Sequence, residues 1–345
     1  MLIKKSRIPV SHVITVGLLP SFLKKFFYRM RGYKIADGVK LSFGCVVIGK
    51  EVEIGKGSSV GFFTVIRARQ IKIDRFVSIG SLTFMDTERI ELGDDCRIRE
   101  QVYVGGLSEP GSMLKLGKRC IIMQMSNLNP AKPIIIGDDS GIGGHCLLFT
   151  HASWLSQLEG FPVKFAPITI GKNVWIPWRV FITAGVTIGD NVLVGPDTVI
   201  SKDIPSNSVA AGTPLKISRN VFNKPVNENS RKKILTEIFG KFADHLQHHG
   251  FSVAKNNFEN GFEIIFTDEK KHQLLYLTGK KGDLVTSGDT VLVLDYEHDV
   301  MTGFSNSGFK MVISLTRKER IGTSDVGEEL VKYFSRHGIR FNRVD

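Results

Sequence analysis

A six-residue period restricts the fold of this chain more than any other feature of its sequence. Between residues 170 and 200 the aliphatic side chains recur at a strict stride of six: Ile170, Ile176, Ile182, Ile188, Val194 and Ile200. Neither the helical period of 3.6 nor the strand period of 2 produces this spacing. A short strand, a corner and the next strand do produce it, with the aliphatic side chain inward and glycine at tight corners. Three such hexads predict one triangular coil, and stacked coils pair their strands in parallel about 4.8 Å apart.

Shorter runs of the same period carry the repeat over about residues 41–217. They are Ile48, Ile54, Val60, Ile66; Ile73, Ile79; Leu92, Ile98, Val104; Leu116, Ile122, Leu128; and Ile136, Ile142, Leu148. We therefore predict a mainly β chain, with a parallel β-helix over 41–217 and a basic helical cap over 1–40. A polar linker over 218–229 then leads to an α+β domain over 230–345, to which the sequence assigns no role.

The C-terminal domain is predicted from a helix over about 229–248 and from four strand-like runs. These runs cover 262–266, 272–277, 289–296 and 310–315, and a closing helix follows near 326–337. The segment Asp289 to Asp299 contains several acids and a histidine, among them Asp295, Glu297 and His298. These side chains allow either a metal site or solvated groups at a strand end. The absence of a recognisable ligand spacing favours solvated groups, and we expect no metal.

All four cysteines occupy one slot of the repeat, four places after an aliphatic residue: Cys45, Cys96, Cys120 and Cys146. Small side chains in this slot face inward, so we predict buried free thiols. A metal or disulfide framework would need clustered or paired spacings, which are absent. Free thiols and the lack of a signal-peptide pattern indicate a cytoplasmic protein.

The repeat is interrupted by residues 149–167, which leave the coil as a loop. Loops of this length in compact proteins are often functional. This loop opens with His151 at the scaffold edge, and it carries Trp154, Phe161 and Phe165, which can pack against a neighbour or a substrate.

Three stretches of residues 136–219 form a specific pattern: IGDDSGIGGHCLLFTHAS, PITIGKNVWI and AGVTIGDNVLVGPDTVISKDIPSNSVAAGTPLKISR. The pattern resembles the hexapeptide-repeat acyltransferases, in particular the galactoside, xenobiotic and polysaccharide O-acetyltransferase group. The resemblance implies a left-handed β-helix and a homotrimer with sites shared between subunits. It also implies direct acetyl transfer from acetyl-CoA, without an acyl-enzyme and without a metal.

In that group a histidine at the start of the loop is the general base, and by position this role falls to His151. Imidazole suits the role because it exchanges protons near neutrality, and such a base contributes roughly 10²–10⁴-fold in rate. The alternative is a loop histidine with a structural hydrogen bond. His145, three places after Ile142 and expected at an outward corner, is the competing candidate. We assign His145 and Trp154 to acceptor binding.

The resemblance also places CoA in a groove between coils of two subunits. Ser201 and Lys202 match the Ser/Thr-Lys pair of the group, while Lys216 and Arg219 match the basic residues after the last coil. Cations near phosphates form strong charge-assisted hydrogen bonds. The alternative is that these are ordinary surface cations.

Trp178, Ala184 and Gly185 complete the predicted cofactor contacts. The sequence departs from the group here, with Trp175-Ile176-Pro177-Trp178 in place of WIG and a small residue, and with Pro196-Asp197 after Gly195. Either the indole of Trp178 stacks along the cofactor or the groove is altered.

The net charge of +12 is concentrated at the N-terminus, where residues 1–40 hold nine basic residues and one acidic residue. The remainder is nearly neutral, which argues against a nucleic-acid partner. Residues 20–31 predict a short helix with Phe22, Phe26 and Met30 on one face. The helix either caps the open end of the β-helix or rests on anionic lipid, possibilities that are compatible.

We therefore predict an O-acetyltransferase that modifies a sugar hydroxyl in the biosynthesis of a cell-surface polysaccharide. N-acetylation of an amino sugar or small amine and acyl transfer from a carrier protein remain open, and a non-catalytic scaffold is a further alternative. A carbonic anhydrase on the same scaffold would need three zinc-binding histidines, but only His145 and His151 lie in the repeat.

Overall fold

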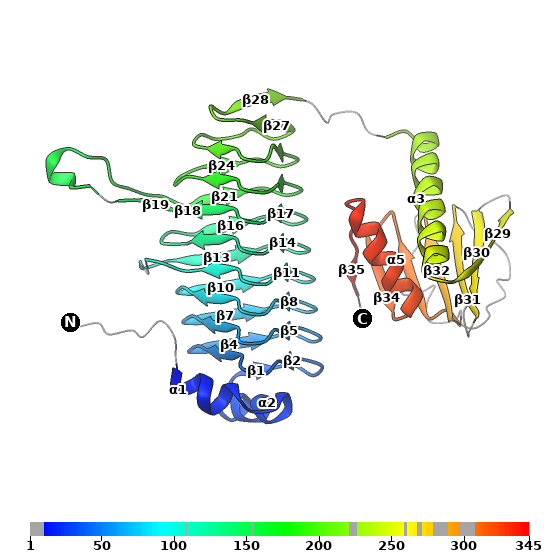
Figure 1. The fold of residues 1–345 in the computed structure, drawn as a ribbon, viewed down its shortest axis with the longest axis horizontal. Coiled ribbons are helices and arrows are strands. Elements are labelled where there is room, and N and C mark those ends of the chain that lie inside the picture. The colour runs from blue at the N-terminus through cyan, green and yellow to red at the C-terminus, as the bar shows by residue number, and fades with distance from the viewer. Residues whose placement is uncertain are drawn as a thin grey trace. The chain divides into compact units, whose positions relative to one another are not determined.

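The computed structural model describes residues 10–107, 109–153, 155–220, 226–258, 261–267, 271–278, 289–296 and 308–344. The chain divides into two compact units, Met1–Asn223 and Lys224–Asp345. Figure 1 shows the first as stacked coils and the second as a sheet with helices.

The first unit is a parallel β-helix of three sheets, which confirms the predicted fold class. Sheet A contains β1 (Lys34–Ile35), β4 (Glu51–Ile54), β7 (Gln70–Ile73), β10 (Arg89–Leu92), β13 (Met113–Leu116), β16 (Ile134–Ile136), β21 (Ile168–Ile170) and β24 (Thr187–Ile188). Sheet B contains β2 (Lys40–Leu41), β5 (Ser59–Val60), β8 (Ser78–Ile79), β11 (Arg97–Ile98), β14 (Ile121–Ile122), β17 (Gly141–Ile142), β22 (Trp175–Ile176), β25 (Leu193–Val194), β27 (Ser208–Ala211) and β28 (Lys216–Arg219). Sheet C contains β3 (Val46–Ile48), β6 (Val65–Arg67), β9 (Phe84–Asp86), β12 (Tyr103–Val104), β15 (Asn127–Asn129), β18 (Leu147–Phe149), β23 (Phe181–Ile182) and β26 (Val199–Ile200).

The coils are longer than three hexads in the N-terminal half. Paired residues of adjacent coils are 19 apart at Glu53 and Lys72 but 18 apart at Thr169 and Thr187. We call the buried apolar residues that recur once per strand the inward column. Its longer steps all fall at the corner from sheet C to sheet A: Val47 to Ile54, Ile66 to Ile73, Met85 to Leu92, Val104 to Leu116, Leu128 to Ile136 and Leu148 to Ile170. One edge of the prism therefore carries all the insertions.

The assignment of Ile48 to the inward column was wrong. Ile66 pairs with Val47, which is 1% exposed, whereas Ile48 pairs with the outward Arg67. A step of seven residues thus precedes Ile54. The β-helix also begins at Lys34, within the segment assigned to the cap.

Glycine is not the usual corner residue, contrary to our expectation. Many corners place a non-glycine residue in the left-handed region, including Phe63, Leu82, Met125 and His145. Several glycines instead make room for the next coil. A Cβ on Gly93, for example, would lie 2.7 Å from the carbonyl carbon of Gly117.

The end of the β-helix that begins with β1 is covered by α1 (Val10–His12), the π-helical turn η1 (Val13–Gly17) and α2 (Ser21–Met30). Lys24 and Tyr28 are buried at this end. The Nζ of Lys24 donates to the Ser42 carbonyl at 2.5 Å, and the Tyr28 hydroxyl accepts from the Val47 amide at 2.9 Å. The helices thus close the first coil and satisfy backbone groups that it leaves open.

All four cysteines are buried and free, as predicted. Desolvation raises the pKa of the Cys45 and Cys146 thiols to about 11. These thiols fill the interior of the coils.

The second unit is a mixed seven-stranded sheet with α3 (Glu228–His248) and α5 (Asp325–Arg336) packed on one face. The strand order is β29 (Ser252–Phe258), β30 (Gly261–Thr267), β31 (Lys271–Leu277), β32 (Asp289–Leu294), β33 (Met311–Ser314), β34 (Glu319–Gly322) and β35 (Asn342–Arg343). The four predicted strand runs and both helices are present, whereas β29, β34 and β35 were not predicted. Asp295 pairs with Arg231 at 2.6 Å and accepts from the Tyr276 hydroxyl at 3.1 Å, while 297–299 lie outside the described residues.

Candidate active site

The interrupting loop leaves the β-helix as an arm, visible as the long green projection in Figure 1. Its base is a two-stranded antiparallel ladder of β19 (His151–Ala152) and β20 (Lys164–Phe165), in which His151 pairs with Phe165. The buried Thr150 hydroxyl donates to the Asn129 carbonyl at 2.8 Å, and the Ala166 amide donates to the Thr150 carbonyl at 3.0 Å. Both ends of the arm are therefore fixed where they meet the scaffold.

The imidazole of His151 is held between two aromatic rings. The Phe149 ring lies at 6.1 Å with an interplanar angle of 7°, and the Phe165 ring lies at 5.8 Å with an angle of 19°. The Nδ1 atom is buried and has no hydrogen-bond partner among the described residues. A buried nitrogen without a partner is uncommon in folded proteins, and a ligand or a second chain would satisfy it.

Two asparagines that the sequence analysis did not single out lie near this point. Asn127 and Asn129 flank the inward Leu128 on β15, and Phe149 is the cross-strand neighbour of Asn129. The Oδ1 atoms of both asparagines are buried without a partner in the described structure. The detectable signal was a pair of amides on either side of an inward leucine, a combination that no other described strand of sheet C carries. Together with His151 they leave three polar atoms unsatisfied on one side of the scaffold.

The arm returns over the next coil at Gly185. A Cβ on this glycine would lie 2.8 Å from Nζ of Lys164 and 3.1 Å from Cβ of Ala166, so β20 passes directly above it. Ala184 itself is buried, with only 3% of the residue exposed. The predicted cofactor residues Ala184 and Gly185 thus follow β23 at the edge that carries the arm.

Ser201 and Lys202 follow β26 at the same edge, one coil further on, and both are exposed. The structure therefore places four predicted cofactor residues along the edge where His151 lies. Lys216 and Arg219 are also exposed but lie on β28, the last strand of sheet B.

His145 and Trp178 lie at a different edge, the corner from sheet B to sheet C. Their rings are 6.2 Å apart, and Trp178 rests on Gly144, whose Cβ would lie 2.0 Å from Cζ3 of the indole. Trp175 covers Gly141 in the same way, with 2.6 Å to Cε3. The unusual Trp175–Trp178 turn is therefore accommodated by glycines in the preceding coil.

The second departure from the pattern lies at the same corner. Asp197 accepts from Arg179 at 2.5 and 2.6 Å across adjacent coils. The hydrogen bonds from Arg179 hold the pKa of Asp197 below its usual value. Trp178-Arg179 and Pro196-Asp197 are thus stacked corner residues, coupled by an ion pair. Trp154, the remaining predicted contact, lies outside the described residues.

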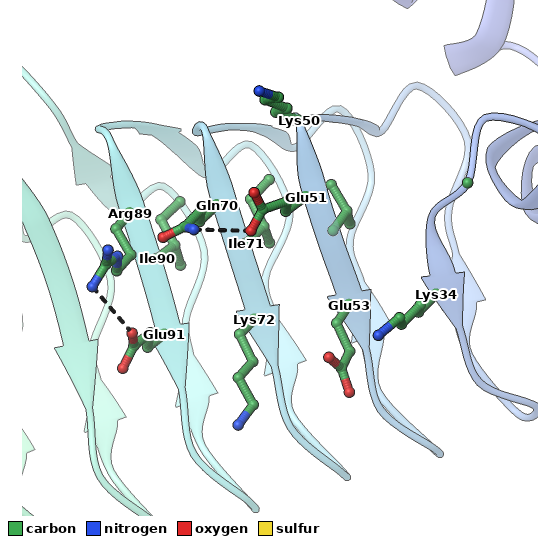
Figure 2. Close-up of a pocket in the computed structure, with 12 residues that line it drawn as sticks. Lys34, Lys50, Glu51, Glu53, Gln70, Ile71, Lys72, Arg89, Ile90 and Glu91 are labelled. Carbon is green, nitrogen blue, oxygen red and sulfur yellow. Dashed lines mark hydrogen bonds and ion pairs between the residues drawn. The ribbon is translucent and has the colours of Figure 1, made fainter.

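A hollow of about 510 Å³ lies elsewhere, on the outer face of sheet A (Figure 2). Its side chains come mainly from β1, β4, β7 and β10, and they carry both signs of charge. Gln70 donates to Glu51 at 2.9 Å, and Arg89 lies 4.0 Å from Glu91. Its lining contains no histidine, cysteine, serine or threonine, and we do not assign chemistry to it. Over the described ranges, moreover, no three His, Cys, Asp or Glu residues are grouped to hold a metal ion.

The repeat matches the bacterial transferase hexapeptide (six repeats) family over residues 167–202. The galactoside O-acetyltransferase of Escherichia coli (strain K12) is 54% identical over 55 residues, which is 16% of this chain and 27% of that protein. A putative acetyltransferase of Staphylococcus aureus (strain MRSA252) is 40% identical over 84 residues, 24% of this chain and 39% of that protein. The chain thus spans well under half the length of these curated relatives.

Among solved structures, the fold is similar to a hexapeptide-repeat-containing acetyltransferase from Vibrio cholerae, complexed with acetyl coenzyme A. That protein is 21% identical, with 61% of this chain and 85% of that chain covered and a TM-score of 0.30.

Proposed function

We propose that the protein transfers an acetyl group from acetyl-CoA to a sugar hydroxyl, because residues 167–202 of its β-helix match the bacterial transferase hexapeptide family. His151 is the general base. The observation that carries this assignment is its position, at the base of the arm between Phe149 and Phe165 and on the edge that also presents Ser201 and Lys202.

The reaction proceeds by direct attack. The imidazole of His151 takes the proton of the acceptor hydroxyl as the oxygen attacks the thioester carbonyl carbon. The carbon–sulfur bond then breaks, and the departing thiolate of CoA takes a proton from the imidazolium. The products are an acetyl ester and free CoA. Stacking between two aromatic rings restrains the base, so that little orientational freedom is lost in the transition state.

Asn127 and Asn129 fit the acceptor side of this site. Their buried Oδ1 atoms have no partner in the described structure, and sugar hydroxyls are hydrogen-bond donors of the right kind. An acceptor that lacks these donors would leave both oxygens unpaired, which favours polyhydroxylated acceptors over apolar alcohols.

A homotrimer would bring the separated residues together. His151 and Lys202 lie at one edge of the prism, whereas His145 and Trp178 lie at another, so one chain does not combine them. The arm exposes apolar side chains that a neighbouring subunit would cover: Leu155 at 54%, Leu158 at 101% and Phe161 at 42%. We therefore propose that the acetyl-CoA groove forms between two subunits.

The test is an assay of free CoA released from acetyl-CoA in the presence of glycan, amino-sugar and small-amine acceptors. Release of CoA with a neutral glycan would support O-acetylation of a polysaccharide. Release of CoA only with amines would show that the acceptor group is an amine and not a sugar hydroxyl. A Lys202→Ala variant should raise the KM for acetyl-CoA without lowering kcat to a similar extent. Lys241→Ala, an exposed lysine of α3, is the matched control.

A further inference from the structure

The N-terminal helix α2 has two different faces. Lys24 and Tyr28 lie on the face that closes the β-helix, where they are 0% and 2% exposed. Phe22, Phe26 and Met30, spaced four apart on the opposite side of the helix, are 67%, 65% and 74% exposed. Closing the first coil therefore does not use these three side chains.

The segment before α2 repeats this arrangement. Val16 is buried against the β-helix, while Val10, Ile14 and Leu18 are 57%, 60% and 45% exposed at the same spacing of four. We call these three residues, together with Phe22, Phe26 and Met30, the N-terminal apolar surface. A monomeric soluble protein rarely exposes a contiguous set of large apolar side chains without a partner for it.

Neither helix can span a bilayer by itself. Over the described residues no single helix is long and apolar enough, and Val10–Gly17 and Ser21–Met30 meet that composition only as a pair, bent by 116°. Such a bend, with one face packed on the protein, suits helices that lie in a membrane interface.

The charge around this surface identifies its partner. The described residues 10–40 hold six basic residues, of which Lys24 is buried, and one acidic residue, Asp37, which is paired with Arg29 at 2.9 Å. Lys25 lies beside the apolar face of α2, and Arg31 follows its last turn. Two copies of so cationic a segment repel each other, whereas anionic lipid headgroups attract both the charge and the apolar side chains.

We propose that the N-terminal apolar surface docks the protein onto an anionic lipid bilayer, with Phe22, Phe26 and Met30 inserted below the headgroups. His151, the base proposed above, lies five strand spacings from the first coil, or about 24 Å along the β-helix.

The test measures lipid binding without acetyl-CoA or acceptor, so that its result is independent of the proposed activity. The purified protein is floated with vesicles of phosphatidylcholine alone and with vesicles containing phosphatidylglycerol, at low and high salt. Binding to the anionic vesicles, weakened by salt, is expected. Phe26→Ser should reduce that binding about tenfold or more, because the side chain no longer enters the apolar layer.

Phe62→Ser is the matched control, since Phe62 is 54% exposed and lies between β5 and β6 of the β-helix, outside the set that forms the N-terminal apolar surface. It should bind as the unchanged protein does, and circular dichroism checks that both variants fold. Lys25→Glu with Arg31→Glu should weaken binding to anionic vesicles only. Failure of the unchanged protein to bind anionic vesicles, or equal losses with Phe62→Ser, would overturn the proposal. If lipid binding fails and Phe26→Ser instead dissociates an oligomer in light scattering, the surface is covered by a second copy.

Discussion

Replacing Gly144 by alanine tests how the Trp175–Trp178 turn is accommodated. An added Cβ would lie 2.0, 2.4 and 2.8 Å from three carbons of the Trp178 ring, whereas carbon atoms in contact are about 3.5–4.0 Å apart. The rigid indole must therefore move by about 1.5 Å and lose its contact with the preceding coil. Over-packing of this kind costs about 1–3 kcal/mol in the free energy of unfolding.

For a unit of this size the loss corresponds to a Tm lower by about 2–4 °C per kcal/mol. All three tryptophans belong to the first unit, so tryptophan fluorescence follows the unfolding of the β-helix. The decisive comparison is a double-mutant cycle with Trp178→Ala, in which the clash is absent and Gly144→Ala should cost much less. An unchanged Tm for Gly144→Ala, or equal losses in both backgrounds, would refute the packing argument.

Three further results follow from the structure. Gly240→Ala in α3 should stabilise the second unit by about 0.5–1 kcal/mol in urea unfolding, because its Cβ meets nothing within 4 Å and alanine favours helix; a loss would contradict this. Burial raises the pKa of Asp94, but the hydrogen bonds and charge of Arg75 lower it more, so the ionised carboxylate stabilises the fold at neutral pH and this stabilisation disappears as the pH falls below the ordinary carboxyl range. An Asp94→Asn variant should therefore have a lower Tm than the unchanged protein at pH 7 and approach it at about pH 3. A Tm difference that stays constant with pH would contradict this. Cys45 and Cys146, with pKa values raised to about 11 by burial, should resist a thiol reagent at pH 8 until the protein unfolds, and rapid labelling of the native protein would show that they are accessible.

The fold could be predicted because the six-residue period leaves one explanation for the aliphatic stride. Its exact register could not, since Val47 and Ile48 are both aliphatic and only the strand pairing shows which one faces inward. The position of the insertions was likewise hidden, because a break in a period does not say which corner of the prism it occupies.

The site was predicted unevenly for a related reason. The position of His151 at the start of the arm follows from the interruption of the repeat. Asn127 and Asn129 were missed, because their importance lies in buried oxygens without partners, which only coordinates can show. The sequence analysis also did not predict that Trp178 and His151 lie at different edges, because the six-residue period orders residues along the chain and does not show which edge of the prism each one occupies.

The central claim is that His151 is the base, and its most direct test is turnover by a His151→Ala variant. Acetyl-CoA at about 100 times its Kd should still stabilise the variant, by about 2.7 kcal/mol, since the claim concerns the chemical step and not binding. With a sugar acceptor, kcat should fall by about 10²–10⁴-fold, while His248→Ala on α3 retains full activity. A His151→Ala variant that binds acetyl-CoA and turns over at the unchanged rate would contradict the account.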